Sequence, residues 1–542
     1  MGQFDFVIVG AGSAGCVLAS RLSENGKYSV CLLEAGGSDL NFWIQMPIGY
    51  GKAFYDKRIN WMYQTEPEPN LDNRRSYWPR GKVLGGSSSI NAMVFIRGQD
   101  RDYDEWRDRG NPGWGYSDLL PYFKKMETAG DGADDWRGGD GPLHVTDPSA
   151  DTHPICEAFI KAGGALGLRH TPDFNGADQE GVGRYQITAK GGIRMSASRA
   201  YLWPAKGRKN LTVIKHARAR RILLEGRRAV GIEYDCKGKR QEVRAGREVI
   251  LSAGAINSPQ LLMLSGIGAG AVLKEPGLDV QLDNPAVGQN LQDHLALDYL
   301  YKAKVPTLND QLRPWWGKLM HGIRYVLARR GPLSLSVNQA GGFYRSREGL
   351  DRPNQQLFFS PLSYTKAPPG RRPLMNPDPF SGFLLATQPT RPTSRGHLTL
   401  ASADPDAAPR IYPNYLSTDF DIQEMLEGAA FLRRLAAAPG LADVIEAEMA
   451  PGPHIQSEED LLADIRARSG TVFHPVSTCR MGPADQGNVV DARLRVHGLG
   501  SLRVVDASIF PTLIAGNTNA PAIMVGEKGA DLVLEDQAEC RF

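Results

Sequence analysis

The sequence predicts an α/β protein with a Rossmann-like dinucleotide-binding domain and a discontinuous second domain of antiparallel strands and helices. Three observations support this prediction. A strand, a glycine-rich turn, a helix and a second strand open the chain. Strand-like apolar runs return in the middle and near the end, and the region between them is rich in proline and aromatic residues. A chain of 542 residues also exceeds one ordinary core, so more than one domain is expected.

The first strand and turn have the pattern of a dinucleotide-binding unit. Phe4 to Val9 is a continuous apolar run, which is typical of a strand buried on both faces of a parallel sheet. Three glycines with G-x-G-x-x-G spacing follow at once: Gly10, Gly12 and Gly15. That spacing permits a tight turn, close approach of backbone to a pyrophosphate, and close packing of the next helix. Alone it is weak evidence, since glycine-rich turns are common.

The elements after the turn complete the unit. A helix is expected from about Ala14 to Ser23, and Ser29 to Leu33 has the pattern of a second apolar strand. Glu34 follows this strand, nineteen residues beyond Gly15, where a carboxylate can accept hydrogen bonds from the adenosine ribose hydroxyls. Strand, turn, helix, strand and acid in this order predict a dinucleotide site.

Composition and charge argue against several functions. The 63 basic and 60 acidic residues leave a net charge of +3 with no long Lys/Arg block, so nucleic-acid binding is not expected. Nowhere do eighteen apolar residues follow one another, and the chain opens on a strand rather than a signal peptide. The six cysteines lack C-x-x-C spacing and favour reduced thiols over a metal site. A cytoplasmic protein is expected, with no transmembrane segment and with peripheral association at the inner membrane left open.

A second glycine-rich turn lies in the segment from Arg80 to Arg97, RGKVLGGSSSINAMVFIR. Such a turn exposes several backbone amides together, which suits an anion or the edge of a polar heterocycle. The alternative is an ordinary serine-rich loop.

Later segments leave the nucleotide sheet and return to it. Repeated strand patterns run from Asn210 to Ser265, with a helix expected to start near Ser258-Pro259, and Leu502 to Val505 is another buried strand. Residues from about Val305 to Pro453 have the pattern of an antiparallel sheet with flanking helices, forming a lid. We therefore expect a nucleotide-binding domain of residues 1–155, 206–305 and 461–542, and a substrate or lid domain of residues 156–205 and 306–460.

Two residues near the carboxyl end are candidates for chemistry. His474 lies in GTVFHPVSTCRMG, and an imidazole titrates near neutral pH, so it can take the proton of an alcohol. Asn517, in GNTNAP, can orient an alkoxide or the imidazole. The alternatives are a structural histidine and a turn residue. The remaining histidines have no partner motif and are expected in packing or surface roles, among them His294, His321 and His497.

Taken together, these blocks resemble the glucose-methanol-choline (GMC) oxidoreductase family of FAD-dependent alcohol-oxidising enzymes. They follow the family's order over almost the whole chain: GxGxxG with Glu34, RGKVLGGSSSIN, LSAGAINSPQLLMLSGIG, VGQNLQDH, HPVSTCRMG, and LRVVDASIFP with GNTNAP. The choline dehydrogenase-like and primary-alcohol dehydrogenase branch is the most similar. The resemblance implies the GMC fold, an FAD cofactor, and oxidation of a primary alcohol to its aldehyde, with proton abstraction from the hydroxyl and hydride transfer to flavin N5.

The resemblance also implies roles for matching positions. His474 matches the family's catalytic histidine, and Asn517 matches its catalytic partner. The positions that it assigns to FAD are Gly10, Gly12, Ser13, Ala14, Gly15, Glu34, Ala35, Gly85, Gly86, Ser87, Asn91, Ala92, Met93, Val94, Ala219, Asp506, Ala507, Asn517 and Thr518. At Ala219 the family has valine beside the adenine, so this contact is expected through the backbone. No metal site is implied.

Two departures refine the expectation. Ile90 stands where some members carry the histidine that attaches FAD covalently, so non-covalent FAD is expected. Gln339 stands where choline enzymes carry a glutamate, which argues against choline. The expected partners are a small alcohol, aliphatic or aromatic rather than a sugar, and a quinone-like acceptor or oxygen. The alternatives are a lyase or decarboxylase on the same scaffold, and an oxygen-using alcohol oxidase.

Overall fold

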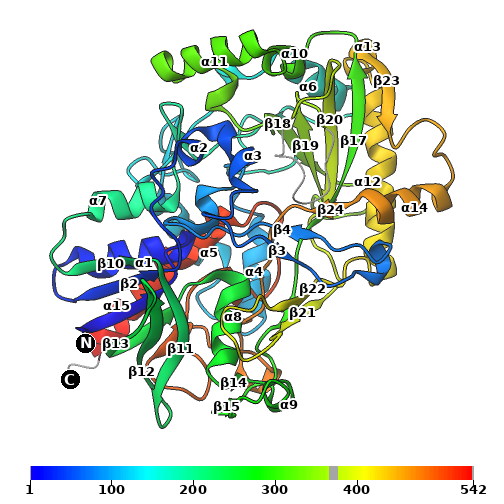
Figure 1. Ribbon diagram of the computed structural model, residues 1–542. Coiled ribbons are helices and arrows are strands. Elements are labelled where there is room, and N and C mark those ends of the chain that lie inside the picture. The colour runs from blue at the N-terminus through cyan, green and yellow to red at the C-terminus, as the bar shows by residue number, and fades with distance from the viewer. Residues whose placement is uncertain (1, 365–375, 540–542) are drawn as a thin grey trace.

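The amino-terminal strand lies at the centre of a mixed sheet in the computed structural model, which describes residues 2–364 and 376–539 (Figure 1). The strand order is β10-β2-β1-β13-β12-β11, and β25 pairs with β13. The strands are β1 (Gly2–Val9), β2 (Val30–Glu34), β10 (Leu211–Lys215), β11 (Ala217–Glu225), β12 (Arg228–Cys236), β13 (Lys239–Leu251) and β25 (Leu502–Val504). Strands from the start, middle and end of the chain therefore share one sheet.

The long strand β13 has both parallel and antiparallel neighbours. Its second part runs parallel to β1 and β25, while its first part is antiparallel to β12, which in turn pairs with β11. The parallel part is the nucleotide-type sheet that the glycine motif predicts. Helices α1 (Ser13–Glu24) and α15 (Asn519–Glu539) pack against each other beside it.

A second sheet is antiparallel throughout and has the order β23-β17-β20-β19-β18-β7, with β24 paired to β17. Its strands are β7 (Gly181–Arg184), β17 (Leu295–Ala303), β18 (Ala340–Tyr344), β19 (Gln355–Ser360), β20 (Gly382–Pro389), β23 (Ile445–Ala450) and β24 (Gly470–Thr471). Helix α12 (Asp419–Ala437) packs on β20. The alternating burial of β17 suits an antiparallel strand, although its residues precede the expected lid boundary at 306. The division into two domains stays a prediction.

Helix α8 (Gly254–Leu264) begins four residues before the position expected from Ser258-Pro259. Pro259 lies inside the helix, where it cannot donate to the carbonyl of Ala255. Thr478 replaces the missing donor, because its hydroxyl lies 2.6 Å from the Ala255 oxygen. This side chain comes from a distant part of the sequence, so local pattern could not reveal it.

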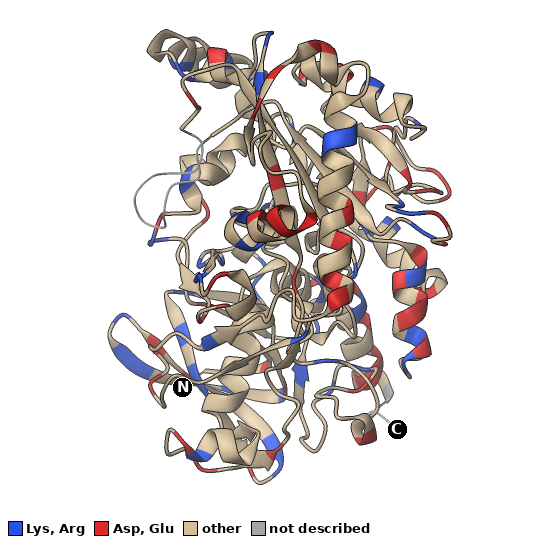
Figure 2. Ribbon diagram, turned by 90° about the vertical axis from the view of Figure 1, so that its right-hand side faces the viewer, with Lys and Arg blue, Asp and Glu red and all other residues tan. Residues whose placement is uncertain are grey.

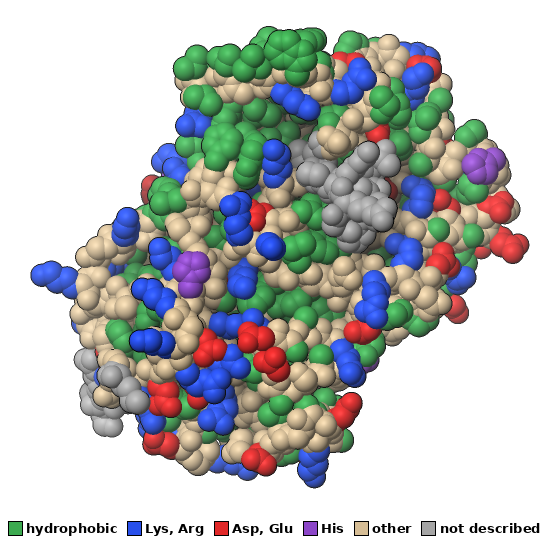
Figure 3. All heavy atoms as spheres, viewed as in Figure 1, with side chains coloured by type: hydrophobic (Ala, Val, Ile, Leu, Met, Phe, Trp, Pro, Cys, Tyr) green, Lys and Arg blue, Asp and Glu red, His purple; other side chains and the backbone are tan. Residues whose placement is uncertain are grey.

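The surface carries charges of both signs and an apolar band. Lys and Arg are interspersed with Asp and Glu over the elements seen in Figure 2. Figure 3 shows hydrophobic side chains gathered at the top of the molecule, over α11 (Trp315–Ala328). Among the helices that the structure describes, none is long and apolar enough to cross a membrane.

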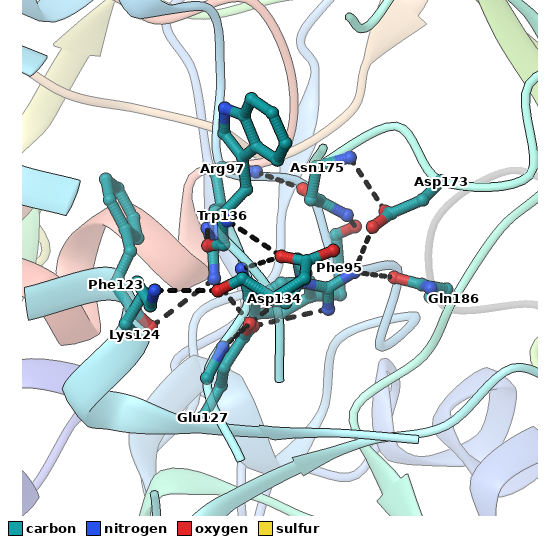
Figure 4. Close-up of polar contacts among 12 residues, drawn as sticks. Phe95, Arg97, Phe123, Lys124, Glu127, Asp134, Trp136, Asp173, Asn175 and Gln186 are labelled. Atoms are coloured by element: carbon teal, nitrogen blue, oxygen red, sulfur yellow. Dashed lines mark hydrogen bonds and ion pairs between the residues drawn. The ribbon is translucent and has the colours of Figure 1, made fainter. Parts of the chain in front are cut away.

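A buried ionic network supports the chain that follows the second glycine-rich turn (Figure 4). Glu127 accepts from both Arg97 and Arg137, and the Nε of Arg137 lies 2.8 Å from its carboxylate. Arg137 also bonds Asp173 at 2.6 Å and Gln186 at 2.8 Å. Loss of any one of these charged partners would leave an uncompensated buried charge, which is costly. The network therefore holds the chain around Arg97 against its neighbours.

Gly15→Ala should destabilise the fold and weaken cofactor binding, because a Cβ on Gly15 would lie 1.9 Å from the Gly10 carbonyl oxygen. Gly164→Ala in helix α6 (Ile155–Ala165) is the matched control, since a Cβ there meets nothing within 4 Å. The control should be neutral or stabilising by about 0.5–1 kcal/mol. Thermal unfolding of both variants measures the difference, and equal stability would contradict the packing role of Gly15.

Candidate active site

A cavity of about 440 Å³ lies between the two sheets. The carboxyl ends of β1 and β2 contribute Val9 and Leu33, and β19 and β20 contribute Phe358 and Leu384. Ligands of parallel α/β sheets bind outside the carboxyl ends of the strands. The cavity therefore extends from a nucleotide-type edge to the face of the antiparallel sheet.

The three glycines of the first turn have different surroundings. A Cβ on Gly10 would lie 2.5 Å from the Ser252 carbonyl oxygen, and one on Gly15 would collide with Gly10. A Cβ on Gly12 would meet only one atom, at 3.8 Å, and Gly12 lines the cavity. Gly10 and Gly15 thus serve backbone packing, while Gly12 leaves room beside the start of α1 for a pyrophosphate.

Glu34 lies at the end of β2 and lines the same cavity. Its carboxylate accepts hydrogen bonds from the backbone amides of Ala11 at 2.9 Å and Gly36 at 2.7 Å. Burial raises the pKa of Glu34 to about 7, and these two amides oppose that rise. The amides hold the carboxyl in place, and its remaining acceptor positions can receive ribose hydroxyls.

Most of the positions expected to bind FAD share this cavity. Those that line it are Gly10, Gly12, Ser13, Ala14, Glu34, Ala35, Gly86, Ser87, Asn91, Ala92, Met93, Val94, Ala219, Asp506, Ala507, Asn517 and Thr518. Gly15 and Gly85 lie outside the lining; the amide of Gly85 donates to the Ala11 carbonyl at 2.7 Å. The cavity brings together segments from both ends and the middle of the chain. An extended dinucleotide such as FAD would contact all of them.

Asp506 ties the middle and the end of the chain together at the cavity. Its carboxylate accepts from the amide of Gly254 at 2.8 Å and from the hydroxyl of Ser258 at 2.6 Å. It also accepts from the amide of Ser508 at 2.8 Å. Burial raises the pKa of Asp506, against the lowering effect of these hydrogen bonds.

His474 lies at the far end of the cavity, in the loop after β24. Its backbone amide donates to Asp293 at 2.7 Å. Its ring Nδ1 lies 3.0 Å from Nδ1 of His294, and its Nε2 lies 3.2 Å from Nδ2 of Asn517. Both ring nitrogens are therefore occupied, and Asn517 stands at the nitrogen that faces the cavity.

A chain of hydrogen bonds fixes the protonation of both imidazoles. Nε2 of His294 lies 2.9 Å from the Thr390 carbonyl oxygen, which can only accept, so this nitrogen carries the proton. Nδ1 of neutral His294 must then accept from Nδ1–H of His474. Nε2 of His474 is left with a lone pair, which is the form that a general base needs.

Both imidazoles are neutral near pH 7. Burial lowers the pKa of His294 to about 4. Burial also lowers the pKa of His474 well below its ordinary value, and His294 and Arg80 lower it further. Neither ring therefore carries a charge that would prevent proton uptake at Nε2.

A neighbouring amide orients Asn517. Nε2 of Gln356 donates to Oδ1 of Asn517 at 3.3 Å, and Oε1 of Gln356 accepts from Gln388 at 2.9 Å. With Oδ1 of Asn517 taken, its Nδ2 donor points to His474. The two glutamines come from β19 and β20, so the antiparallel sheet orients the amide that lies beside the candidate base.

Comparison with known proteins decides the family. The model of the GMC oxidoreductase amino-terminal domain matches residues 4–296, and that of the carboxyl-terminal domain matches residues 392–526. The chain belongs to the GMC oxidoreductase family. An alcohol dehydrogenase [acceptor] of Pseudomonas putida is 45% identical over 98% of this chain and 96% of its own. An oxygen-dependent choline dehydrogenase of Vibrio vulnificus is 44% identical over 99% and 95%.

Solved structures of two oxidases agree with this fold. Pyridoxine 4-oxidase from Mesorbium loti superimposes with a TM-score of 0.88 at 33% identity, over 98% of this chain and 99% of its own. A formate oxidase of Aspergillus oryzae RIB40 gives 0.91 at 28% identity, over 99% of each chain. The predicted fold, family and FAD cofactor are confirmed, and the chain is an FAD-dependent oxidoreductase acting on CH–OH donors.

The structure changes the interpretation of two residues. His294 was expected in a packing or surface role, yet it contacts the ring of His474. Its place in the GMC block VGQNLQDH was the available signal. Gln339 does not line the cavity, and its side chain accepts from the amide of His153 at 2.7 Å. The lack of charge at Gln339 therefore gives no argument against choline.

FAD should dissociate from this GMC enzyme on denaturation. Ile90 lines the cavity, and among the described lining residues His474 is the only histidine and there is no cysteine. No imidazole or thiol is thus placed for attachment except the candidate base. Acid precipitation should release all flavin absorbance into the supernatant; a yellow pellet would contradict this prediction.

Proposed function

We propose that the enzyme oxidises an apolar primary alcohol to its aldehyde, with His474 as the general base. The hydrogen-bond chain from the Thr390 carbonyl through His294 to His474 supports this proposal, because it leaves the cavity-facing nitrogen unprotonated. Anaerobic addition of alcohols to the yellow holoenzyme tests it, since bleaching requires oxidation of the alcohol.

The residues of the site divide the work. Nε2 of His474 takes the hydroxyl proton, and the growing negative charge on the substrate oxygen makes loss of hydride easier. When the alcohol binds, its hydroxyl takes the place of Asn517 at Nε2 of His474, and Nδ2–H of Asn517 then donates a hydrogen bond to the substrate oxygen; the amide does not titrate. When bound, FAD accepts the hydride. Nδ1–H of His474 keeps its bond to His294, so the ring does not rotate as its charge changes.

The lining near His474 favours an apolar substrate. Side chains from the second sheet, from the segment before β18 and from the loop of His474 contribute carbon surface: Val337, Phe358, Leu384, Ala386, Val472 and Phe473. Apolar pockets with a few convergent polar groups bind apolar ligands with fixed orientation. A panel of benzyl alcohol, medium-chain alcohols and a hexose measures this preference, and faster turnover of the hexose would refute it.

The electron acceptor completes the proposal. The name of the Pseudomonas putida relative leaves the electron acceptor unspecified, and the name of the Vibrio vulnificus relative specifies oxygen. Both relatives align over at least 98% of this chain. The branch resemblance favours a quinone-like acceptor over oxygen. Turnover measured with a water-soluble quinone under argon, and then in air without quinone, separates a dehydrogenase from an oxidase.

His474→Ala should slow flavin reduction by about 10² to 10⁴, because general-base catalysis contributes that much. Asn517→Ala should lose less, about 10- to 1,000-fold, as the loss of one oriented donor. The measurement is anaerobic stopped-flow reduction by a saturating alcohol, with flavin content determined for each variant. His454→Ala, at an exposed histidine, is the control. Reduction of His474→Ala at the wild-type rate would assign the base to another residue.

The rate of flavin reduction should stay constant as pH falls from 8 to about 6.5, the ordinary pKa of histidine. Burial lowers the pKa of His474, so the neutral base persists below that pH and activity falls only when the ring is protonated. A wild-type rate that already declines at pH 7.5 would contradict the lowered pKa.

The hydrogen bond between His474 and His294 gives a second prediction. His294→Phe removes the acceptor of Nδ1–H of His474, and His294→Gln restores one. We expect the rate of flavin reduction to fall about tenfold in the first variant and to recover in the second.

A further inference from the structure

Helix α11 presents large apolar side chains to solvent. Leu327 is 81% exposed and Trp315 is 76% exposed. The large apolar residues of α11 that are more than half exposed are Trp315, Trp316, Leu319, Met320, Ile323, Val326 and Leu327. Single exposed apolar residues are ordinary, but a contiguous set on one helix marks an interaction surface. Figure 3 shows hydrophobic side chains gathered over this helix, and we call these seven residues the α11 face.

The α11 face points directly away from the protein. With about 3.6 residues per turn, its members cover an arc of about 140°. The buried residues of the helix, Gly317, His321 and Tyr325, lie on the opposite side. The helix is therefore anchored by one face, and the face with the larger apolar side chains has no partner among the described residues.

Basic residues surround the α11 face. From Arg313 to Arg330 the sequence RPWWGKLMHGIRYVLARR contains five Lys and Arg residues and neither Asp nor Glu. On the helix, Lys318 and Arg324 flank the two edges of the apolar arc, and both are exposed. The acidic partner of Arg324 is Asp151, at 3.5 Å on the surface, where an ion pair is weak.

We infer that the α11 face docks the enzyme on the surface of an anionic phospholipid bilayer. A helix with an apolar arc flanked by cations lies in the plane of such an interface, with its apolar side chains among the lipids. Lys318 and Arg324 can extend to the phosphates, and tryptophan rings prefer the headgroup level. The inference concerns attachment and does not depend on the proposed reaction.

Charge favours lipid over a second copy of the chain. A two-fold dimer through the α11 face would bring together two surfaces that each carry the cations of this segment. Like charges at an interface are repulsive. An anionic headgroup layer instead attracts the cations of this segment.

The docked helix adjoins the walls of the active-site cavity. Tyr325 of α11 packs in one hydrophobic cluster with Tyr50, Phe54 and Val337, which line the cavity. A bilayer under α11 would thus lie on the cavity side that this cluster forms. Supply of an apolar alcohol or a quinone from the lipid is a consequence that rests on the proposed function, whereas docking does not.

Vesicle flotation of the full-length holoenzyme tests the inference. The protein should float with vesicles of equal parts phosphatidylglycerol and phosphatidylcholine, and binding should weaken in high salt and with phosphatidylcholine alone. Ile323→Glu combined with Leu327→Glu should reduce binding at least about tenfold. Met449→Glu, at an exposed apolar residue of β23, is the control and should bind like the wild type.

A second variant separates loss of the face from loss of the fold. Lys318→Glu combined with Arg324→Glu keeps the apolar arc and should abolish the salt-sensitive part of binding. Flavin absorbance and the thermal midpoint must match the wild type for either double variant to count. Absence of wild-type binding to anionic vesicles would overturn the inference, as would unchanged binding of both folded double variants. A different result would assign the α11 face to a second copy of the chain: the wild type is a dimer that does not bind vesicles, and the Ile323→Glu, Leu327→Glu variant is a monomer.

Discussion

Close packing of backbone against backbone at the carboxyl edge of the parallel sheet is the constraint on which this structure depends. A Cβ on Gly36 would lie 1.9 Å from the Lys82 carbonyl oxygen, and one on Gly86 would lie 2.7 Å from Cα of Gly12. The second glycine-rich turn therefore rests directly on the first. Side chains at these positions would push the two turns apart, and the cavity between the sheets would lose the backbone that lines one of its walls.

The second sheet depends on this edge and completes it. Its strands β19 and β20 provide Gln356 and Gln388, which orient Asn517, although Asn517 itself follows the returning strand β25 of the first sheet. The candidate base is thus positioned by both sheets at once. An amide has no charge to lose or gain between pH 5 and 9, so the orientation of Asn517 does not depend on pH. A carboxylate partner could change its protonation state, and the orientation would then depend on pH.

The parts of the site that could be predicted from sequence are those whose chemistry depends on local spacing. The glycine triplet and Glu34 follow from one strand–turn–helix unit, and His474 and Asn517 follow from blocks that resemble a family. The contact of His294 with His474 joins residues 180 positions apart, and no periodicity reveals such a pair. The start of α8 differs from the sequence prediction for a similar reason, because the distant Thr478 supplies the hydrogen bond that Pro259 cannot make.

The partner of the candidate base decides how firmly it holds a proton. Asp293 lies close by, and burial raises its pKa to about 6, but it accepts from the backbone amide of His474 rather than from the ring. It also accepts from Thr471 and Tyr415. The ring itself meets neutral His294. An imidazole stabilises a neighbouring imidazolium less than a carboxylate does, so a proton taken up at Nε2 of the candidate base would be held weakly. Weak retention of the proton would favour return of the candidate base to its neutral form.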